Sequence, residues 1–126
     1  MLETSATGWL KADKIKISQQ VGLAALANTV GLKLSQGQRY SAKESTFMKN
    51  GSSLDFVVSV ERKGYPIRLV IVEMDGPQHT SDRKQVARDK RKDSILGKMN
   101  GVWLVRATKP SQLEEALTLI GAELWA

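Results

Sequence analysis

Apolar residues are concentrated in the second half of the chain, where they form three short runs rich in β-branched side chains. The runs cover residues 53–60, 67–75 and 102–106, and their length and composition predict strands. Gly64 and Pro66 lie between the first two runs and predict a turn, so these strands form an antiparallel hairpin. The second run is apolar at nearly every position in its middle, which is typical of a strand buried on both faces.

Two segments of the second half have the periodicity of helices. Residues 82–100 predict one helix, which Gly101 ends. A final helix is predicted after residue 108, because four apolar residues recur there at helical spacing: Leu113, Leu117, Ile120 and Leu124.

The first half of the chain is more polar, and its elements are less distinct. We expect residues 1–12 to be loosely held, because they are mostly small and polar. Ser18 is a good helix N-cap residue before an apolar stretch, which predicts a helix over residues 18–30. Residues 37–47 predict a weak edge strand that carries Tyr40.

Together these elements predict a single α/β domain with a mixed central sheet flanked by helices. A chain of 126 residues with 41% hydrophobic residues suits one packed core. No apolar run approaches the roughly 18 residues of a membrane span, and no secretory signal is seen, so we expect a cytoplasmic protein with no membrane partner. The lack of cysteine excludes disulfides, thiolate zinc sites and cysteine nucleophiles, and one histidine excludes a multi-histidine metal site.

The charge balance is strongly basic. Nineteen Lys and Arg against 13 Asp and Glu give a formal net charge of +6. A small domain with this excess attracts polyanions, of which nucleic acid is the commonest. Charge alone leaves open a basic protein with no nucleic-acid partner.

Carboxylates fall on a face of the second strand that is otherwise aliphatic. Side chains of a strand alternate between its two faces, so Glu73 and Asp75 share the face of Leu69 and Ile71. Folding does not require acids there. Strand-end acids on a wet rim are common, however, and this reading remains open.

The hairpin adds a third carboxylate to this face. If Glu61 pairs with Ile67 across the turn, the same register places Asp55 opposite Glu73. Opposed residues have Cβ atoms about 4.5–5.5 Å apart, so two half-buried charges there repel each other. A divalent cation removes that cost, and magnesium commonly takes one or two carboxylates together with water and substrate phosphate. A register that differs by two residues is the alternative.

The helix predicted over residues 82–100 has an inward side that changes character along its length. At about 100° per residue, that side carries Gln85, Asp89, Lys92, Ile95, Leu96 and Met99. Its polar first half would face the sheet near the end of the second strand, unless the first turns overhang solvent. The outer side carries Arg83, Lys90, Arg91, Ser94 and Lys98, which we expect to be solvated or to face phosphate.

These residues resemble the PD-(D/E)XK nuclease superfamily, in which an Asp begins one strand and Glu-x-Lys follows on the next. Asp55 matches the first acid, and Glu-Met-Asp at residues 73–75 matches the Glu-x-Lys. More narrowly, three features look like the subgroup near the very-short-patch-repair endonucleases. They are Glu-x-Asp-Gly-x-x-His at residues 73–79, a helix with an Arg-Asp pair, and a strand from Gly101 that ends in Arg106. The resemblance covers residues 53–107.

The resemblance implies a restriction-endonuclease-like core, αβββαβ, with an extra C-terminal helix. It also implies a metal-dependent DNA endonuclease that hydrolyses phosphodiester bonds. Asp55, Glu73 and Asp75 would hold Mg²⁺, for which Mn²⁺ is expected to substitute.

Position 75 carries an aspartate where the family has its lysine, so the cation beside the attacking water would come from elsewhere. Lys92 is our first choice on helix geometry, and Gln78 is the alternative. His79 would assist proton transfer or contact phosphate. Glu44 is a further candidate, because some members of the family use an N-terminal acid.

DNA is the partner that the resemblance and the charge both favour. A chain of 126 residues leaves little room for a sequence-reading element, so structure-selective or weakly sequence-specific cutting is expected. Small members of the family often dimerise to cut two strands, which allows a homodimer here. Two rivals remain open: a catalytically inactive nuclease fold that binds nucleic acid, and an interaction protein whose acidic pocket takes a partner's cation.

Overall fold

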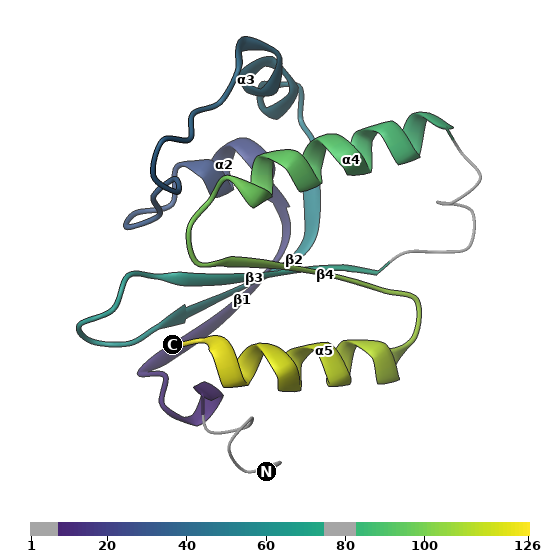
Figure 1. Ribbon diagram of the computed structural model, residues 1–126. Coiled ribbons are helices and arrows are strands. Elements are labelled where there is room, and N and C mark those ends of the chain that lie inside the picture. Colours follow the sequence, from purple (N-terminus) through teal and green to yellow (C-terminus); the bar gives the residue numbers. More distant parts are fainter. Residues whose placement is uncertain (1–7, 75–82) are drawn as a thin grey trace.

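A computed structural model of the chain describes residues 8–74 and 83–126, which form an α/β fold around a four-stranded sheet (Figure 1). The strands are β1 (Lys14–Gly22), β2 (Ser53–Glu61), β3 (Arg68–Met74) and β4 (Val102–Ala107), and they lie in the sheet in that order. Strand β2 pairs antiparallel with both β1 and β3, whereas β4 runs parallel to β3. The sheet is therefore mixed, as the sequence predicts.

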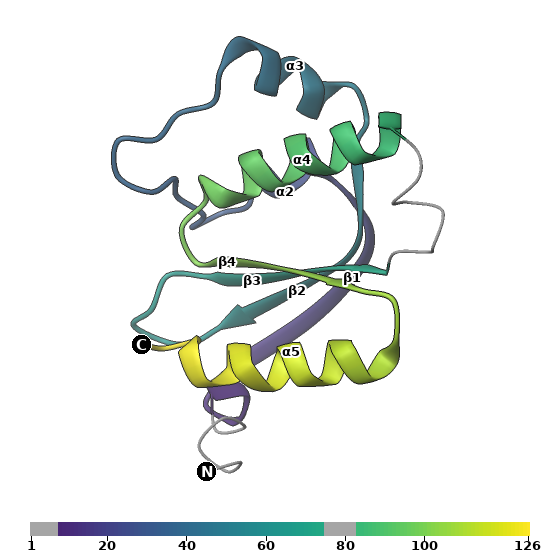
Figure 2. The same ribbon diagram turned by 45° about the vertical axis from the view of Figure 1, so that its right-hand side comes forward.

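Helices cover both faces of the sheet (Figure 1, Figure 2). On one side lie α2 (Leu23–Ala27), α3 (Ala42–Lys49) and α4 (Arg83–Gly97), and on the other lies α5 (Pro110–Glu123). Of the helices in the described part of the chain, none has the length and apolar character needed to cross a membrane.

The middle of β3 is buried on both faces, as its apolar run predicts. Leu69 and Ile71 belong to the core that packs against α2 and α4, whereas Val70 and Val72 belong to the core that packs against α5. Because side chains alternate along a strand, Glu73 lies on the face that α4 covers.

The helix predicted over residues 18–30 is wrong in its first part. Residues 14–22 form the edge strand β1, and only Leu23–Ala27 are helical. Ile15 and Ile17 alternate with lysines at the period of a strand, and β1 pairs with β2 along its length. This pairing satisfies backbone groups that a short, weakly capped helix would leave to solvent.

The weak edge strand predicted over residues 37–47 is also wrong, because these residues lead into α3. Ser41 Oγ accepts a hydrogen bond from the Glu44 N–H at 3.1 Å, and the Ser41 N–H donates to Glu44 Oε1 at 2.8 Å. This reciprocal capping box satisfies two backbone donors and favours a helix start over a strand. Tyr40 therefore precedes a helix.

The segment after residue 7 packs against α5, although the sequence predicts a loosely held N-terminus. The Trp9 indole N–H donates to the Leu117 carbonyl at 2.8 Å. A Cβ on Gly8 would lie 1.7 Å from the carbonyl oxygen of Gly121, so the close approach of these backbones requires glycine. Residues 1–7 lie outside the described part of the chain.

Candidate functional site

Asp55 and Glu73 lie opposite each other at one end of the β2–β3 hairpin. The neighbouring pair is Phe56 with Val72, which is the register that the sequence predicts, and that prediction is confirmed. The Asp55 N–H donates to Glu73 Oε2 at 3.1 Å, and the Met74 N–H donates to Asp55 Oδ2 at 3.0 Å. Each carboxylate thus accepts a backbone hydrogen bond from the other strand, and the two groups are held side by side.

Glu73 is buried, with 5% of its surface exposed. Burial raises the pKa of the Glu73 carboxyl above its ordinary value, and the negative charge of Asp55 acts in the same direction. Hydrogen bonds from the Asp55 N–H and from Lys92 act against that rise in pKa. The site therefore holds an acid at a position where ionisation is costly, which is the situation that a bound cation relieves.

Lys92 of α4 brings a positive charge into contact with this pair. Its Nζ lies 3.1 Å from Glu73 Oε1 and donates to the Ser53 carbonyl at 2.8 Å. Ile95 and Leu96, in the next turn of α4, are buried against the sheet, so the predicted inward side of the helix is confirmed. Because the C-terminal half of α4 packs on the sheet through these apolar residues, Lys92, one turn earlier on the same side, lies beside the carboxylates.

The two aspartates of α4 are engaged by β4. Arg106 lies 3.2 Å from Asp89 Oδ2 and 2.7 Å from Asp93 Oδ1, and Gln85 donates to Asp89 Oδ1 at 3.0 Å. Hydrogen bonds and charge from both aspartates raise the pKa of Arg106 against the effect of its burial. The ion pairs fix the N-terminal half of α4 over the ends of β3 and β4 (Figure 1).

The carboxylate pair has the donor chemistry that a hard divalent cation prefers. Glu73 Oε1, Glu73 Oε2 and Asp55 Oδ2 accept hydrogen bonds, whereas Asp55 Oδ1 accepts none from the described residues. Within residues 8–74 and 83–126, no group of three His, Cys, Asp or Glu side chains is arranged to hold a metal ion. Two carboxylates suffice for Mg²⁺, which usually keeps several waters.

Three further predicted site residues, Asp75, Gln78 and His79, lie outside the described part of the chain.

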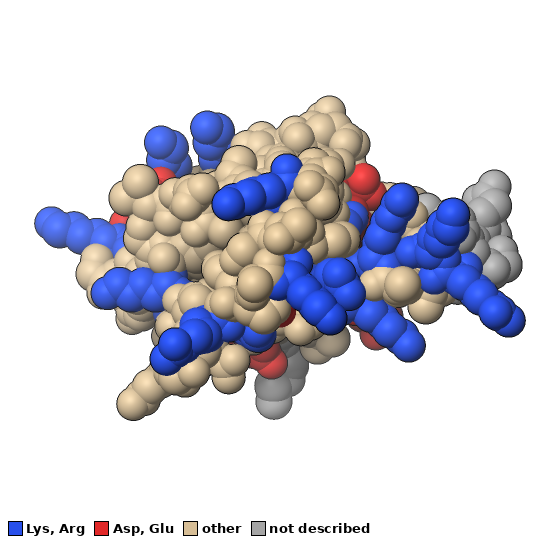
Figure 3. All heavy atoms as spheres, turned by 90° about the horizontal axis from the view of Figure 1, so that it is seen from above, with Lys and Arg blue, Asp and Glu red and all other residues tan. Residues whose placement is uncertain are grey.

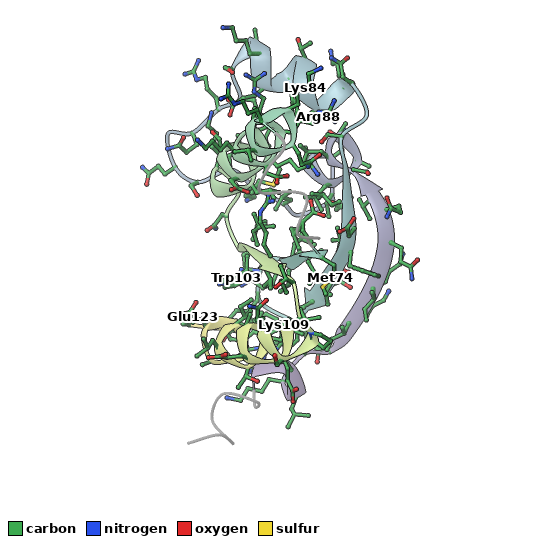
Figure 4. The ribbon with its side chains drawn as sticks, turned by 90° about the vertical axis from the view of Figure 1, so that its right-hand side faces the viewer. Met74, Lys84, Arg88, Trp103, Lys109 and Glu123 are labelled. Carbon is green, nitrogen blue, oxygen red and sulfur yellow. The ribbon has the colours of Figure 1, made fainter. Side chains whose placement is uncertain are left out.

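A cavity of about 530 Å³ adjoins Lys92 between α3 and α4. It is lined by Phe47 of α3, by residues 50–53, and by Gln85, Arg88 and Lys92 of α4. Arg88 projects from α4 toward α3 and the start of β2, whereas Met74 lies at the end of β3 (Figure 4). Lys92 thus belongs both to the carboxylate site and to the wall of this cavity.

Lys and Arg side chains gather over α3 and α4 (Figure 3). This basic surface comprises Lys43, Lys49, Arg83, Arg88, Lys90 and Arg91, all exposed and none in an ion pair with a described carboxylate. Part of the outer side of α4 is covered, however, because Ser94 and Lys98 both contact Glu44 of α3. The prediction that Lys98 faces solvent or phosphate is therefore wrong.

Glu44 serves the packing of α3 rather than the carboxylate pair. It is 8% exposed, forms an ion pair with Lys98 and accepts a hydrogen bond from the Ser41 N–H. These two hydrogen bonds, chiefly the one from Lys98, lower the pKa of the Glu44 carboxyl from 4.5 to about 2. The described contacts give Glu44 no link to Asp55 or Glu73.

The Glu44 carboxyl is expected to make the protein sensitive to acid. Because its pKa is lower in the folded than in the unfolded chain, the stabilisation is complete above about pH 4.5 and is lost as the pH falls toward 2. Glu44→Gln is expected to remove on the order of 1–3 kcal/mol from the unfolding free energy at neutral pH and to flatten its slope between these pH values. Urea unfolding followed across that range measures both effects. An unchanged slope would show that the ion pair with Lys98 does not contribute.

Several residues around the site escaped the sequence analysis. Gln20 interrupts the β1–β2 pairing between Gln19 and Val21, and it has φ 51°, a left-handed conformation that is uncommon for a residue other than glycine. Its Oε1 accepts a hydrogen bond from Ser53 Oγ at 3.4 Å. No feature of the sequence indicates the left-handed conformation of Gln20. Phe47 lies in residues 37–47, which the sequence predicts as a strand, so its place beside the site could not be anticipated.

Comparison of the chain with protein-family models, with curated proteins and with solved structures finds no match.

Proposed function

We propose that the chain is a divalent-metal-dependent phosphodiesterase that cuts DNA, built on a restriction-endonuclease-like core. The observation that carries the proposal is the pairing of Asp55 with Glu73, a buried acid, beside the ammonium group of Lys92. The preceding residues on the same face of β3, Leu69 and Ile71, are apolar and buried. The two acids and the lysine therefore form a charged group next to a hydrophobic core. Such a group favours a role in chemistry over one in folding.

Asp55 and Glu73 would hold the metal ion, and Asp75 is proposed as a further ligand from its position in the sequence. A bound Mg²⁺ supplies a Lewis acid for the phosphate and makes hydroxide accessible near neutral pH. The backbone hydrogen bonds between the two strands orient the carboxylates, so little rearrangement is needed on binding.

Lys92 is proposed to take the role of the lysine that the PD-(D/E)XK resemblance places at position 75. Its contacts with Glu73 and the Ser53 carbonyl fix the ammonium group at the edge of the cavity. From there it can stabilise negative charge that develops on a phosphate. Gln78 and His79 remain proposed contributors from the segment after β3.

The basic surface is proposed to bind the phosphate backbone of DNA. Its members lie over α3 and α4, on the same side of the sheet as the carboxylate pair (Figure 3). Affinity gained from such contacts falls steeply with salt, because binding releases counterions.

The salt dependence gives a prediction for one exposed residue. Lys90→Ala is expected to reduce the magnitude of the slope of log affinity against log salt by about 1, since it removes one phosphate contact. Fluorescence anisotropy with a paired duplex at several salt concentrations measures the slope. Lys63→Ala, in the β2–β3 turn, is the matched control and should leave the slope as it is. Equal slopes for wild type and Lys90→Ala would place the DNA on another face.

Cleavage is tested directly with a supercoiled plasmid and with short branched and paired duplexes. We expect nicking or cutting with Mg²⁺ or Mn²⁺ and none with EDTA. Cutting that persists in EDTA, or no cutting with either metal on any substrate, would contradict the proposal.

A second candidate function is nucleic-acid binding without cleavage. It is favoured by the hydrogen bonds that already occupy three of the four oxygens of Asp55 and Glu73. A pair held in this way can stabilise the end of the hairpin with no metal. Salt-sensitive DNA binding without metal-dependent cutting would identify this second function.

A further inference from the structure

The cavity between α3 and α4 has walls of three different chemistries. Phe47 supplies an aromatic ring, Arg88 and Lys92 supply positive charge, and Gln85 supplies a side-chain amide. Its volume of about 530 Å³ lies within the range of small-molecule sites. The cavity is far too small for a duplex but suits one nucleotide.

The segment that follows α3, residues 50–53, lines one side of the cavity. Asn50 ends α3 with φ −80° and ψ 17°, and Gly51 follows with φ 86°. A right-handed residue followed by a left-handed one turns successive N–H groups to the same side and forms an anion-binding concavity. The N–H groups of Gly51 and Ser52 donate to no acceptor in the described part of the chain.

Phe47 is held firmly in the wall. It packs against the core that includes Met48 and Leu54, and the guanidinium of Arg91 lies 5.7 Å from its ring centroid. A second hollow, of about 310 Å³ and lined in part by Arg91, also borders this ring. A fixed ring with open space beside it can stack on a base at little entropic cost.

Lys92 joins the cavity to the carboxylate pair. Its Nζ is 3.1 Å from Glu73 Oε1, and its side chain also lines the cavity. A DNA strand whose phosphate lies at Asp55 and Glu73 therefore has its adjoining nucleotide within reach of Phe47 and Arg88.

We infer that this cavity receives one unpaired nucleotide of the DNA substrate, with its base on Phe47 and its phosphate near Arg88 and the Gly51 and Ser52 N–H groups. The inference rests on the proposed action on DNA. It deepens that proposal by naming the substrate class, which is DNA with a nucleotide outside the base-paired stack. A fully paired duplex has no nucleotide that can enter the cavity unless a base is extruded from the helix, and extrusion costs free energy.

The test compares two duplexes of the same sequence, one fully paired and one with a single bulged nucleotide. Binding of the full chain is measured by fluorescence anisotropy in EDTA, so that no cleavage occurs. We expect the bulged duplex to bind about 5- to 150-fold more tightly, which is the range for one base stacked on an aromatic ring. Phe47→Leu keeps an apolar side chain and should bring the affinity ratio close to one.

Arg88→Ala is a second variant, because Arg88 is exposed and its removal does not disturb the core. It should weaken binding of the bulged duplex more than that of the paired duplex. Lys90→Ala is the matched control on the same helix, outside the cavity, and should weaken both duplexes in the same proportion. Equal affinity of the wild type for both duplexes, or a ratio that survives both Phe47→Leu and Arg88→Ala, would overturn the inference.

Cleavage of the bulged and the paired duplex with Mg²⁺, measured side by side, separates this inference from the proposed function. Metal-dependent cutting together with an affinity ratio of one would overturn the nucleotide pocket and leave the nuclease proposal standing. A ratio that depends on Phe47 without any cutting would support the pocket and contradict the hydrolytic function.

Discussion

Replacing Asp55 with asparagine is expected to lower Mg²⁺-dependent DNA cleavage by at least about 100-fold while leaving the fold intact. The amide oxygen of asparagine can still accept the Met74 N–H, which Asp55 Oδ2 accepts at 3.0 Å. The variant loses only the charge that a divalent cation needs. Its thermal stability should equal or exceed that of the wild type, because the repulsion of Glu73 is removed.

The matched control for Asp55→Asn is Asp13→Asn. Asp13 Oδ2 also accepts a backbone N–H, from Lys63 at 2.6 Å, but Asp13 directly precedes β1, at the other end of the β1–β2 pair. Initial rates of plasmid nicking, with melting temperatures of the same samples, compare the two variants. Asp55→Asn that cuts like the wild type, or Asp13→Asn that loses activity to the same degree, would show that the Asp55 charge has no part in catalysis.

Replacing Lys92 with methionine is expected to cost about 3 kcal/mol of unfolding free energy at neutral pH. The side chains of Lys92 and Glu73 are only 12% and 7% exposed, so the change leaves a buried carboxylate without its charged partner. For a chain of this size the melting temperature should fall by roughly 10 °C. Cleavage should fall as well, since the same ammonium group faces the phosphate site.

The double variant Lys92→Met with Glu73→Gln separates the ion pair from simple packing. Removing both charges should restore most of the lost stability but none of the activity. Thermal and urea unfolding of the wild type, the two single variants and the double variant give the coupling free energy. Losses that simply add, with no recovery in the double variant, would show that the two side chains do not stabilise each other.

The second half of the fold could be predicted because its signals are local and strong. The β-branched runs, the turn at Gly64 and Pro66, and the apolar side of α4 each predict one element. The hairpin turn also predicted the register that places Asp55 beside Glu73, and the structure decides between that register and one shifted by two residues. The reach of Lys92 toward this pair followed from helical spacing and packing.

The first half was predicted poorly because its elements depend on distant partners. Strand β1 has lysines between its isoleucines and is mostly exposed, so it is defined mainly by pairing with β2. Helix α3 contains little apolar surface, although Ser41 and Glu44 have the spacing of a capping box and that signal was missed. Without α3, neither the cavity at Phe47 nor the Glu44–Lys98 pair could be foreseen.

Direct titration with Mn²⁺, followed by the electron paramagnetic resonance signal of the free ion, tests whether Asp55 and Glu73 together form a cation site. We predict that the wild type binds about one Mn²⁺ per chain, that Mg²⁺ displaces it, and that Asp55→Asn and Glu73→Gln each weaken binding by at least about tenfold. Binding of Mn²⁺ to Asp55→Asn as tightly as to the wild type, or no binding to either, would contradict the account.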